Sequence, residues 1–582
     1  MGFFDSSIFN IFRKKKKLHG VWEKYYTKEE LDIHIPDISM YDHIVLSEHK
    51  YSKLKAIEYL GVKITYHQLL TKVNTIAKSF KALGVKKGDI FTICLPNFPE
   101  ALYCLYALNK LGAVANMTHP LSAEGELKEA VNSTRSKILV MCNQFYNKLE
   151  PIVDETNLKH IIFVNAADSM NLFMGIAYKL MNIGKYKYPK KGTYMMNWNK
   201  FKSLSKKVPN IKYRKMGKNQ PAVIIHSGGT SGKPKNVVIQ NRAFYLGAKQ
   251  TGDIDLHLKP GDSCLAIMPN FHGFGLSVCM HTALTLGCYT TLVPQFDAKK
   301  FDVLFNKTKP TIVLGVPTLF EALISNNNVK NLDLSFLKFV VSGGDQLPKT
   351  LEDRINDYLV EHNSPAHITQ GYGLSEALAA VSLCHHDINK SGSIGIPLAG
   401  NYIKIIDPGT RKELPFGETG EIVVHTKALM LGYLNEESET NDALQMHDDG
   451  HVWLHTGDLG YMDEDGFIFY KGRQKRMIIT SGYNVYPSHI EEVIESHPDV
   501  LQCTVVGIPH PYKQEVAKAF IVLKDGTFNP FVKQSIKDLC KKNLAKYMVP
   551  AEFVFRKKLP KTKLGKVDFQ MLKQDNGADD DE

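Results

Sequence analysis

Residues 222–235 carry the strongest local signal in this chain, AVIIHSGGTSGKPK, in which an apolar run leads into a loop rich in glycine and hydroxyl residues. The loop consists of Ser227, Gly228, Gly229, Thr230, Ser231, Gly232, Lys233, Pro234 and Lys235. Its glycines let backbone amides approach an oxyanion closely, its hydroxyl groups add donors and Lys235 adds positive charge, so the loop suits a phosphate group. Composition alone also leaves open a flexible Gly/Ser loop without a ligand.

The loop differs from the Walker phosphate loop. That motif places Ser or Thr directly after its lysine, where a helix begins. Here Pro234 follows Lys233, and proline at this point does not fit the Walker geometry. We therefore expect a phosphate-binding loop of a different class.

Strands and helices are predicted to alternate on both sides of the loop. Upstream, apolar periodicity predicts a helix at 65–83, a strand at 90–95, a helix at 100–111 and a strand near 113–117. Downstream, a second set runs through residues 264–268, 277–286, 290–293, 312–314 and 339–341. Such alternation indicates parallel α/β layers.

The pattern changes beyond Arg473. Helices are predicted at 488–496 and 532–544, and strands at 503–506 and 517–523. These elements indicate a separate α+β domain of ordinary size.

Length and composition indicate a large enzyme with several domains. The chain has 582 residues, of which 43% are apolar and 23% charged, so it can bury two or three cores of usual size. Its nine cysteines form no Cys-x-x-Cys pair, which favours reduced thiols and a cytoplasmic location. The net charge of +12 favours anionic partners, and no zinc spacing or helix-turn-helix signal supports nucleic acid.

Three segments raise the question of membrane contact. Residues 263–296 contain no charged side chain, but their prolines, glycines and histidines favour a buried strand, loop and helix lining an apolar cavity over a membrane span. Residues 1–20 fit either a basic amphipathic helix on an anionic bilayer or a solvated terminus. Residues 170–198 contain an apolar run too short to span, which fits a surface hairpin or helix, or contact with a membrane or acyl chain.

Five further motifs follow the loop in a fixed order. They are Gln370-Gly371-Tyr372-Gly373-Leu374-Ser375-Glu376, Gly392 to Pro397, Thr456-Gly457-Asp458, Gly472-Arg473-Gln474-Lys475, and Pro560-Lys561-Thr562-Lys563-Leu564-Gly565-Lys566. Together with the loop, they resemble the adenylate-forming superfamily, which contains acyl-CoA synthetases, peptide-synthetase adenylation domains and firefly luciferase. The resemblance covers roughly residues 50–572 and is closest in character to fatty-acid–CoA ligases.

The resemblance implies an α/β fold with two main domains. A large N-terminal domain at 21–473 would combine layered α/β sheets with a barrel-like β part. A small mobile α+β domain at 474–574 would carry a catalytic lysine. The basic segment 1–20 and the acidic tail 575–582 would lie outside both.

The resemblance also assigns an ATP site that needs no protein nucleophile, since a carboxylate attacks the α-phosphorus directly. Glu376 would hold Mg²⁺ with help from Thr230, Tyr372 would stack on adenine, and Asp458 would bind the ribose hydroxyls. The remaining ATP ligands would be Ser227, Gly228, Gly229, Ser231, Gly232, Lys235, Gly344, Asp345, Gln370, Gly371, Gly373, Ser375 and Arg473.

By the same resemblance, Lys566 is the main catalytic candidate, because its ammonium would bind the carboxylate and α-phosphate oxygens during adenylation. Lys475 matches the hinge about which the small domain pivots between two half-reactions. The second state would bring Ser481, Gly482 and Tyr483 toward coenzyme A. Taken singly, each lysine would be read as a solvated side chain or a plain linker.

The acid is expected to bind near residues 269–275, where Phe271, His272, Phe274 and Gly343 would border the acyl site. Amino-acid-activating relatives typically carry Asp at the position of His272, so an uncharged carboxylic acid is favoured. His272 also fits a satisfied core histidine.

The predicted function is an ATP-dependent, AMP-forming acyl-CoA synthetase that uses a medium- or long-chain fatty acid, with ATP, Mg²⁺ and coenzyme A. Two alternatives stay open: a ligase that loads a carrier protein, and a catalytically silent acyl or nucleotide sensor. The predicted location is cytoplasmic, with peripheral contact at the inner face of a membrane as an open alternative.

Overall fold

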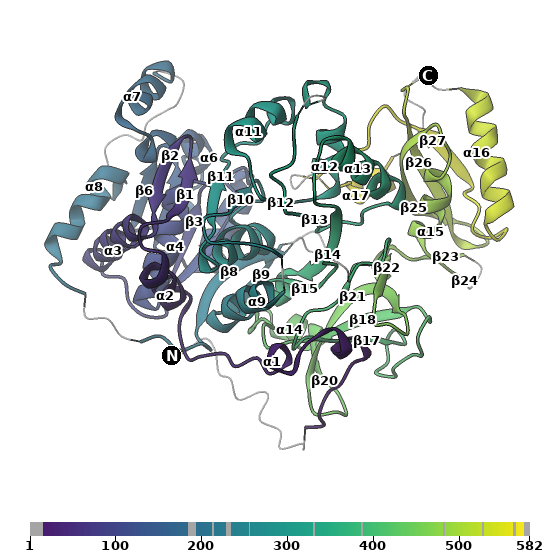
Figure 1. The fold of residues 1–582 in the computed structure, drawn as a ribbon, viewed down its shortest axis with the longest axis horizontal. Helices are drawn as coiled ribbons and strands as arrows, with labels where there is room; N and C mark the ends of the chain where they lie inside the picture. Colours follow the sequence, from purple (N-terminus) through teal and green to yellow (C-terminus); the bar gives the residue numbers. More distant parts are fainter. Residues whose placement is uncertain are drawn as a thin grey trace.

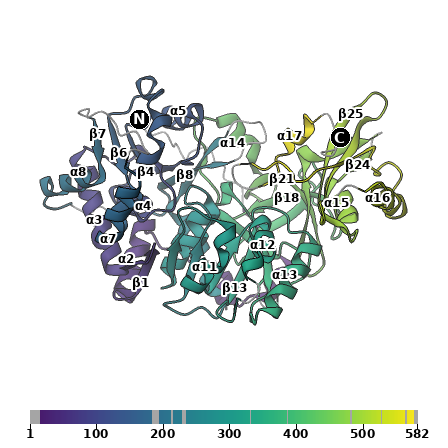
Figure 2. The ribbon, with the colours of Figure 1, turned by 90° about the horizontal axis from the view of Figure 1, so that it is seen from above.

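The computed structural model describes residues 15–183, 194–211, 215–227, 234–254, 256–329, 332–385, 388–480, 483–526, 529–562 and 566–575. They form a large N-terminal domain and a smaller C-terminal domain, which lies at one end of the molecule in both Figure 1 and Figure 2. The α/β architecture with two domains of unequal size confirms the predicted fold class.

The first large sheet has eight strands in the order β19-β9-β8-β4-β3-β5-β6-β7. Its strands are β3 (Ile90–Cys94), β4 (Val114–Met117), β5 (Ile138–Cys142), β6 (His160–Val164), β7 (Met195–Asn197), β8 (Pro221–Ser227), β9 (Lys235–Gln240) and β19 (Gly432–Tyr433). Neighbours from β8 to β7 are parallel, whereas β9 and β19 are antiparallel. The glycine-rich loop therefore joins two antiparallel strands, β8 and β9.

The second large sheet has nine strands in the order β16-β15-β14-β13-β12-β10-β11-β1-β2. Its strands are β1 (Lys55–Tyr59), β2 (Val62–Thr65), β10 (Ser263–Ala266), β11 (Tyr289–Leu292), β12 (Ile312–Gly315), β13 (Phe339–Gly343), β14 (Ile368–Leu374), β15 (Ala379–Leu383) and β16 (Ile396–Pro397). The strands from β1 to β14 are parallel, as the alternation of strands and helices predicts.

Alternating side chains of the parallel strands separate two cores. In β12, Ile312 and Leu314 join the central core, whereas Val313 packs on the opposite face against α11 (Phe301–Thr308), α12 (Pro317–Ile324) and α13 (Lys349–Glu361). This period of two is that of a strand with both faces buried.

The central core lies between the two large sheets. Its helices are α2 (Met40–Tyr51), α3 (Tyr66–Ala82), α4 (Pro99–Leu111) and α9 (Asn241–Asp253). Every residue of α4 except Lys110 is buried, including the polar Glu100 and Asn109, and most of its other side chains are apolar, as expected for a helix inside the core. On the outer face of the first sheet, α5 (Glu124–Ser133) and α6 (Tyr146–Leu149) cover β5 and β6.

A third, antiparallel sheet of five strands completes the large domain. It contains β17 (Tyr402–Ile406), β18 (Gly420–His425), β20 (Leu444–Met446), β21 (Val452–Met462) and β22 (Ile468–Arg473). Short helices α1 (Lys28–Leu31) and α14 (Glu437–Ala443) lie nearby, as Figure 1 shows.

The C-terminal domain has its own five-stranded sheet and its own core. The strands are β23 (Ile478–Thr480), β24 (Tyr483–Val485), β25 (Val500–His510), β26 (Gln514–Leu523) and β27 (Glu552–Phe555). Helices α15 (Pro487–Glu495) and α16 (Pro530–Asn543) share the core cluster of this sheet, and α17 (Phe569–Lys573) follows Lys566. The α+β pattern predicted beyond Arg473 is thus present.

Of the three segments discussed for membrane contact, residues 263–296 are described in full, whereas residues 1–14 and 184–193 of the other two lie outside the described residues. Residues 263–296 form β10, a π-helix at Phe274–Thr282, α10 (Ala283–Thr285) and β11, so the expected strand and helix are present. The apolar run at 172–181 forms helix α7 (Leu172–Met181), which precedes α8 (Trp198–Ser203). Within the described residues, no helix is both long enough and apolar enough to cross a membrane.

Candidate functional site

The glycine-rich loop begins and ends at a defined pair of residues. Ser227 lies opposite Lys235 in the β8–β9 register, so both ends of the loop stand at the same edge of the sheet. Lys235 forms an ion pair with Glu439 of α14, and its ammonium lies 4.6 Å from the centre of the Tyr433 ring. The tip of the loop, Gly228 to Lys233 with Thr230, lies outside the described residues.

The carboxyl ends of β13 and β14 meet at one place, as parallel neighbours must. Ser342 lies opposite Gln370 and Gly343 opposite Gly371. The Ser342 hydroxyl is buried and has no hydrogen-bond partner among the described residues, so it is available to a polar ligand group. Gly344 has φ +81°, a conformation that favours glycine and lets the chain turn away from the strand end.

Gln370 forms a hydrogen bond with Glu352, a partner that the sequence did not suggest. Its side-chain amide donates to Glu352 of α13 at 3.0 Å, and Glu352 also accepts from the Ser391 hydroxyl at 2.8 Å. Gln370 thus fastens β14 to α13 in this structure.

Glu376 is held by a tyrosine from another sheet. It follows β14 in a short 3₁₀ turn with Ser375, and its Oε1 accepts a 2.8 Å hydrogen bond from the Tyr433 hydroxyl of β19. Because Tyr433 also contacts Lys235, the glycine-rich loop and the Glu376 turn share one anchor. Tyr433 was missed in the sequence, where a Gly-Tyr pair far from Glu376 gives no signal.

Asp458 stands at the centre of a buried polar cluster. Its carboxylate accepts a 2.7 Å hydrogen bond from the Tyr372 hydroxyl and lies 3.0 Å from Nε of Arg473, its neighbour across the β21–β22 pair. The Asp458 side chain is 2% exposed. Burial raises the pKa of Asp458, and the charge of Arg473 opposes that rise.

The part of β21 that carries Asp458 has a further support, also missed in the sequence. Glu421 of β18 accepts a 3.0 Å hydrogen bond from the Gly457 amide, and its second oxygen lies 3.2 Å from Nδ1 of His455. Glu421 therefore fixes the stretch of β21 directly before Asp458.

Lys566 reaches this cluster from the C-terminal domain. Burial lowers the pKa of its ammonium, and the positive charge of Arg473 lowers it further. The carboxylates of Asp345 and Asp458 raise this pKa in opposition. Both figures show α17, which begins three residues later, on the side of the C-terminal domain that faces the large domain. The charges of these large-domain residues therefore act on Lys566 in the described arrangement.

The segment predicted to border the acyl site, residues 269–275, contacts the end of β13 and is influenced by the charge of Lys566. Burial, together with the charge of Lys566, lowers the pKa of His272 to about 4, so the imidazole is neutral at physiological pH. Phe271 packs against His119, with ring centres 4.3 Å apart. A methyl group added to Gly343 would lie 3.6 Å from the Phe274 ring, which places these two residues in contact.

The π-helix that starts at Phe274 requires glycine at its second position. A Cβ on Gly275 would lie 2.2 Å from the carbonyl oxygen of Pro269, far inside contact distance. π-Helical turns occur often at functional sites, and this one begins at Phe274, whose ring lies next to Gly343 at the end of β13.

Tyr483 lies away from this cluster. It stacks on Tyr547 within the C-terminal domain, with ring centres 4.5 Å apart, and is largely exposed. Ser481 and Gly482 lie outside the described residues. Lys475 belongs to a 3₁₀ turn between β22 of the large domain and β23 of the small one, where a change in backbone angles would move the small domain.

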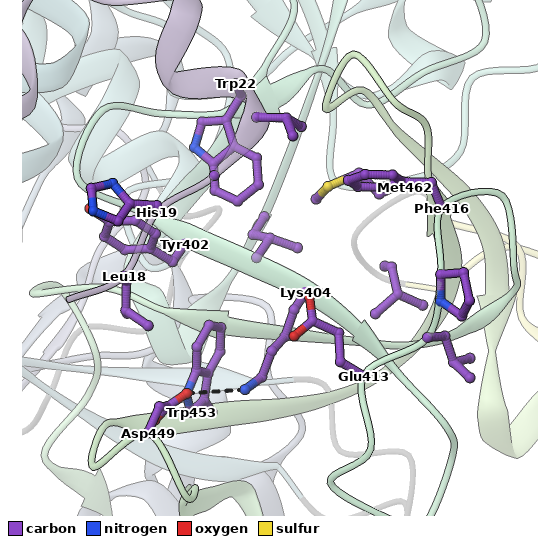
Figure 3. Close-up of a pocket in the computed structure, with 16 residues that line it drawn as sticks. Leu18, His19, Trp22, Tyr402, Lys404, Glu413, Phe416, Asp449, Trp453 and Met462 are labelled. Carbon is purple, nitrogen blue, oxygen red and sulfur yellow. Dashed lines mark hydrogen bonds and ion pairs between the residues drawn. The ribbon is translucent and has the colours of Figure 1, made fainter. Parts of the chain in front are cut away.

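One cavity lies elsewhere, between the N-terminal segment and the third sheet (Figure 3). Trp22 and Tyr402 border it, and Lys404 forms a 3.1 Å ion pair with Asp449 at its wall. No sequence-predicted site residue lines it, so it is distinct from the cluster around Asp458.

The residues of the cluster fit a magnesium nucleotide. The Glu376 carboxylate offers a hard oxygen for Mg²⁺, the partnerless Ser342 hydroxyl and the strand-end glycines suit a ligand that approaches the backbone, and Lys566 and Arg473 supply positive charge. The described residues contain no group of three His, Cys, Asp or Glu side chains arranged for a metal; of the two predicted Mg²⁺ ligands, Glu376 is described and Thr230 lies outside the described residues.

Comparison with known proteins decides the family. The model of the AMP-binding enzymes matches residues 47–434, and that of the AMP-binding enzyme C-terminal domain matches residues 489–566. The chain belongs to the AMP-binding enzyme family. Among curated relatives of this AMP-binding enzyme, a long-chain-fatty-acid–CoA ligase of Bacillus subtilis is 30% identical over 548 residues, which cover 92% of this chain and 94% of the relative.

Solved structures agree on the fold. An anthranilate CoA ligase in complex with anthranoyl-AMP superposes with a TM-score of 0.81 at 23% identity, covering 93% of this chain and 98% of its own. A fatty acyl CoA synthetase of Mycobacterium tuberculosis has a TM-score of 0.66 at 25% identity and covers 92% and 98%. The predictions of an adenylate-forming fold and of an AMP-forming acid–thiol ligase with ATP, Mg²⁺ and coenzyme A are confirmed at the level of the family.

Proposed function

We propose that this AMP-binding enzyme joins a medium- or long-chain fatty acid to coenzyme A in two steps. The fatty acid carboxylate first attacks the α-phosphorus of ATP, forming an acyl-adenylate and releasing diphosphate. The thiol of coenzyme A then attacks the acyl carbon and releases AMP. The long-chain-fatty-acid–CoA ligase of Bacillus subtilis, similar along almost its whole length, supports this acid class.

The proposal is carried by Arg473 and the buried Asp458, whose side chains lie 3.0 Å apart across the β21–β22 pair. It is supported by the effect of the charges of Asp345, Arg473 and Asp458 on the pKa of Lys566 in the C-terminal domain. Attack on phosphorus concentrates negative charge on its oxygens, so a cation delivered to this point stabilises the transition state more than the ground state. We assign that role to Lys566.

The other residues bind and align the nucleotide. Asp458 accepts hydrogen bonds from the ribose hydroxyls, and the Tyr372 and Arg473 contacts hold its carboxylate in place. The backbone around Ser227, Gly344 and Gly371 receives the phosphates and adenine. Mg²⁺ held by Glu376 and Thr230 would neutralise phosphate charge when bound.

The acid enters beside Phe271, His272 and Phe274. A neutral His272 leaves no positive or negative charge to select an amino acid, because its pKa lies near 4. The contact of the Phe274 ring with Gly343 supports an apolar wall for an alkyl chain.

The second step needs a different arrangement of the domains. With Lys475 as the hinge, rotation withdraws Lys566 and moves residues Ser481, Gly482 and Tyr483 toward the acyl-adenylate. In the described arrangement Tyr483 is largely exposed, which leaves it free to be moved. Residues 21–473 and 474–574 are the two rotating domains in this proposal.

Peripheral contact with the inner face of a membrane is also part of the proposal. The basic cluster at 13–17 attracts anionic lipid. The first described contact of this segment with the large domain follows residues 1–14: the Lys16 amide donates to the Asp449 carbonyl at 3.0 Å.

The test is release of AMP and consumption of coenzyme A by the purified protein over an acid panel of graded chain length. We expect kcat/KM to rise from short acids to acids of medium or long chain. An amino acid preferred over every fatty acid would contradict the acid class. Acid-dependent ATP–diphosphate exchange without any consumption of coenzyme A would instead favour a ligase that loads a carrier protein.

A further inference from the structure

The surface of helix α7 is unusually apolar for an exposed element. Seven of the twenty-one large apolar side chains exposed in the described part of the chain lie between residues 172 and 183. They are Leu172, Phe173, Met174, Ile176, Leu180, Met181 and Ile183, and the Phe173 side chain is 84% exposed. An exposed apolar cluster of this density marks an interaction surface.

The way α7 is fixed to the large domain leaves these side chains outward. Gly175 is the one buried residue of the helix and lies against Ala167. The Tyr178 hydroxyl accepts a hydrogen bond from the side-chain amide of Gln144. Asn171 caps the first turn, its side chain accepting from the Met174 amide at 2.9 Å. The helix is therefore held by one narrow stripe, and its apolar residues contribute little to that attachment.

The chain segment that carries α7 is strongly basic, and the charges of Lys179 and Lys202 act on Asp168, which directly precedes the segment. Residues 169–218 contain thirteen Lys and Arg residues and no Asp or Glu. Of the described ones, Lys179 on α7, Lys200 on α8 and Lys206 and Lys207 directly after α8 are exposed. Both views show α7 and α8 at the same end of the large domain, opposite the C-terminal domain. Apolar side chains thus stand in a stretch of chain that has a large excess of cations.

We propose that α7 is a membrane-docking helix that inserts its apolar side chains into the surface of an anionic phospholipid bilayer. At ten residues, or about 15 Å, it is too short to span, but an apolar helix flanked by lysines suits the boundary between headgroups and acyl chains. The lysines of α7 and α8 then contact the phosphate headgroups. The inference rests on the proposed peripheral membrane contact and assigns it to a second site, independent of residues 1–14.

The test compares the full-length protein with the double variant Phe173→Gln/Leu180→Gln in sedimentation with vesicles of phosphatidylcholine containing phosphatidylglycerol. Glutamine keeps the helix propensity while removing the apolar groups. We expect the partition coefficient to fall at least about tenfold, because each buried Phe or Leu side chain contributes that much or more. The matched control is Phe531→Gln on α16, where Phe531 is 85% exposed, and we expect it to bind within about twofold of the unaltered protein.

Three further arms separate this inference from the alternatives. Deletion of residues 1–14 should leave α7-dependent binding in place, and coenzyme A consumption with a soluble short acid should be unchanged in the double variant. Binding of the double variant equal to that of the unaltered protein overturns the inference. The inference is also overturned if the unaltered protein self-associates, the double variant does not, and both bind vesicles equally. In that case a second copy of the chain would cover α7.

Discussion

Replacement of Lys566 by methionine tests the central electrostatic argument. Methionine keeps most of the length and apolar volume of the side chain and removes only the ammonium. Because burial lowers the pKa of Lys566, the charged form is less favourable in the folded protein than in the unfolded chain. The substitution should therefore not lower the free energy of unfolding, and a loss of activity can be attributed to the missing charge.

The magnitude follows from the surroundings of the ammonium. For two unit charges about 4 Å apart near a protein surface, where the effective dielectric constant is about 20, the attraction is about 4 kcal/mol. Removal of one preorganised donor to a developing oxyanion costs about 10²- to 10³-fold in kcat. We expect a loss of that size in acid-dependent ATP–diphosphate exchange.

The assay measures the two half-reactions separately. Thioester formation from a supplied acyl-adenylate and coenzyme A should fall less than about fivefold, because no charge then develops on phosphorus under attack. The matched control is Lys573→Met, an exposed lysine on α17, which should retain full exchange activity. An equal loss in both half-reactions would refute the role assigned to Lys566.

Three further substitutions probe neighbouring contacts. Tyr433→Phe removes the 2.8 Å hydrogen bond to Glu376 and should raise the Mg²⁺ concentration for half-maximal exchange about five- to tenfold, with kcat little changed; an unaltered Mg²⁺ dependence would contradict this. Asp458→Asn should raise the KM for ATP at least about tenfold, and an unchanged KM would remove Asp458 from the ribose site. Between pH 6.5 and 4, His272 binds fewer protons in the folded protein than in the unfolded chain, so the free energy of unfolding falls as the pH is lowered through this range. In urea unfolding, the His272→Gln variant should lose about 2 kcal/mol less of this free energy between pH 7 and 5 than the unaltered protein. An equal loss in both proteins would refute the buried neutral imidazole.

The sequence predicted those parts of the fold that depend on local periodicity. The helix expected at 65–83 is α3, the strand at 90–95 is β3, and the helix at 488–496 is α15, each within a few residues. Such elements are readable because hydrogen bonding within helices and burial on alternate sides of strands impose short periods on the chain.

Local periodicity could not predict the conformation at residues 274–282. The apolar stretch predicted a helix, but not a π-helix, whose wider turns depend on the close packing of Gly275 against Pro269. That packing brings a loop residue against a helix residue, and a contact of this kind leaves no periodic pattern in the sequence.

By itself the sequence determined the order of the motifs, the apolar run that leads into the glycine-rich loop and the chemistry of each candidate side chain. Only the tertiary structure decided which groups meet: Tyr433 with Glu376, Glu352 with Gln370, and Lys566 with the Asp458 cluster. The physical reason is that a motif specifies backbone shape and charge locally. Contacts between residues far apart in the chain follow from strand order and domain packing, which are set by the burial of the whole core.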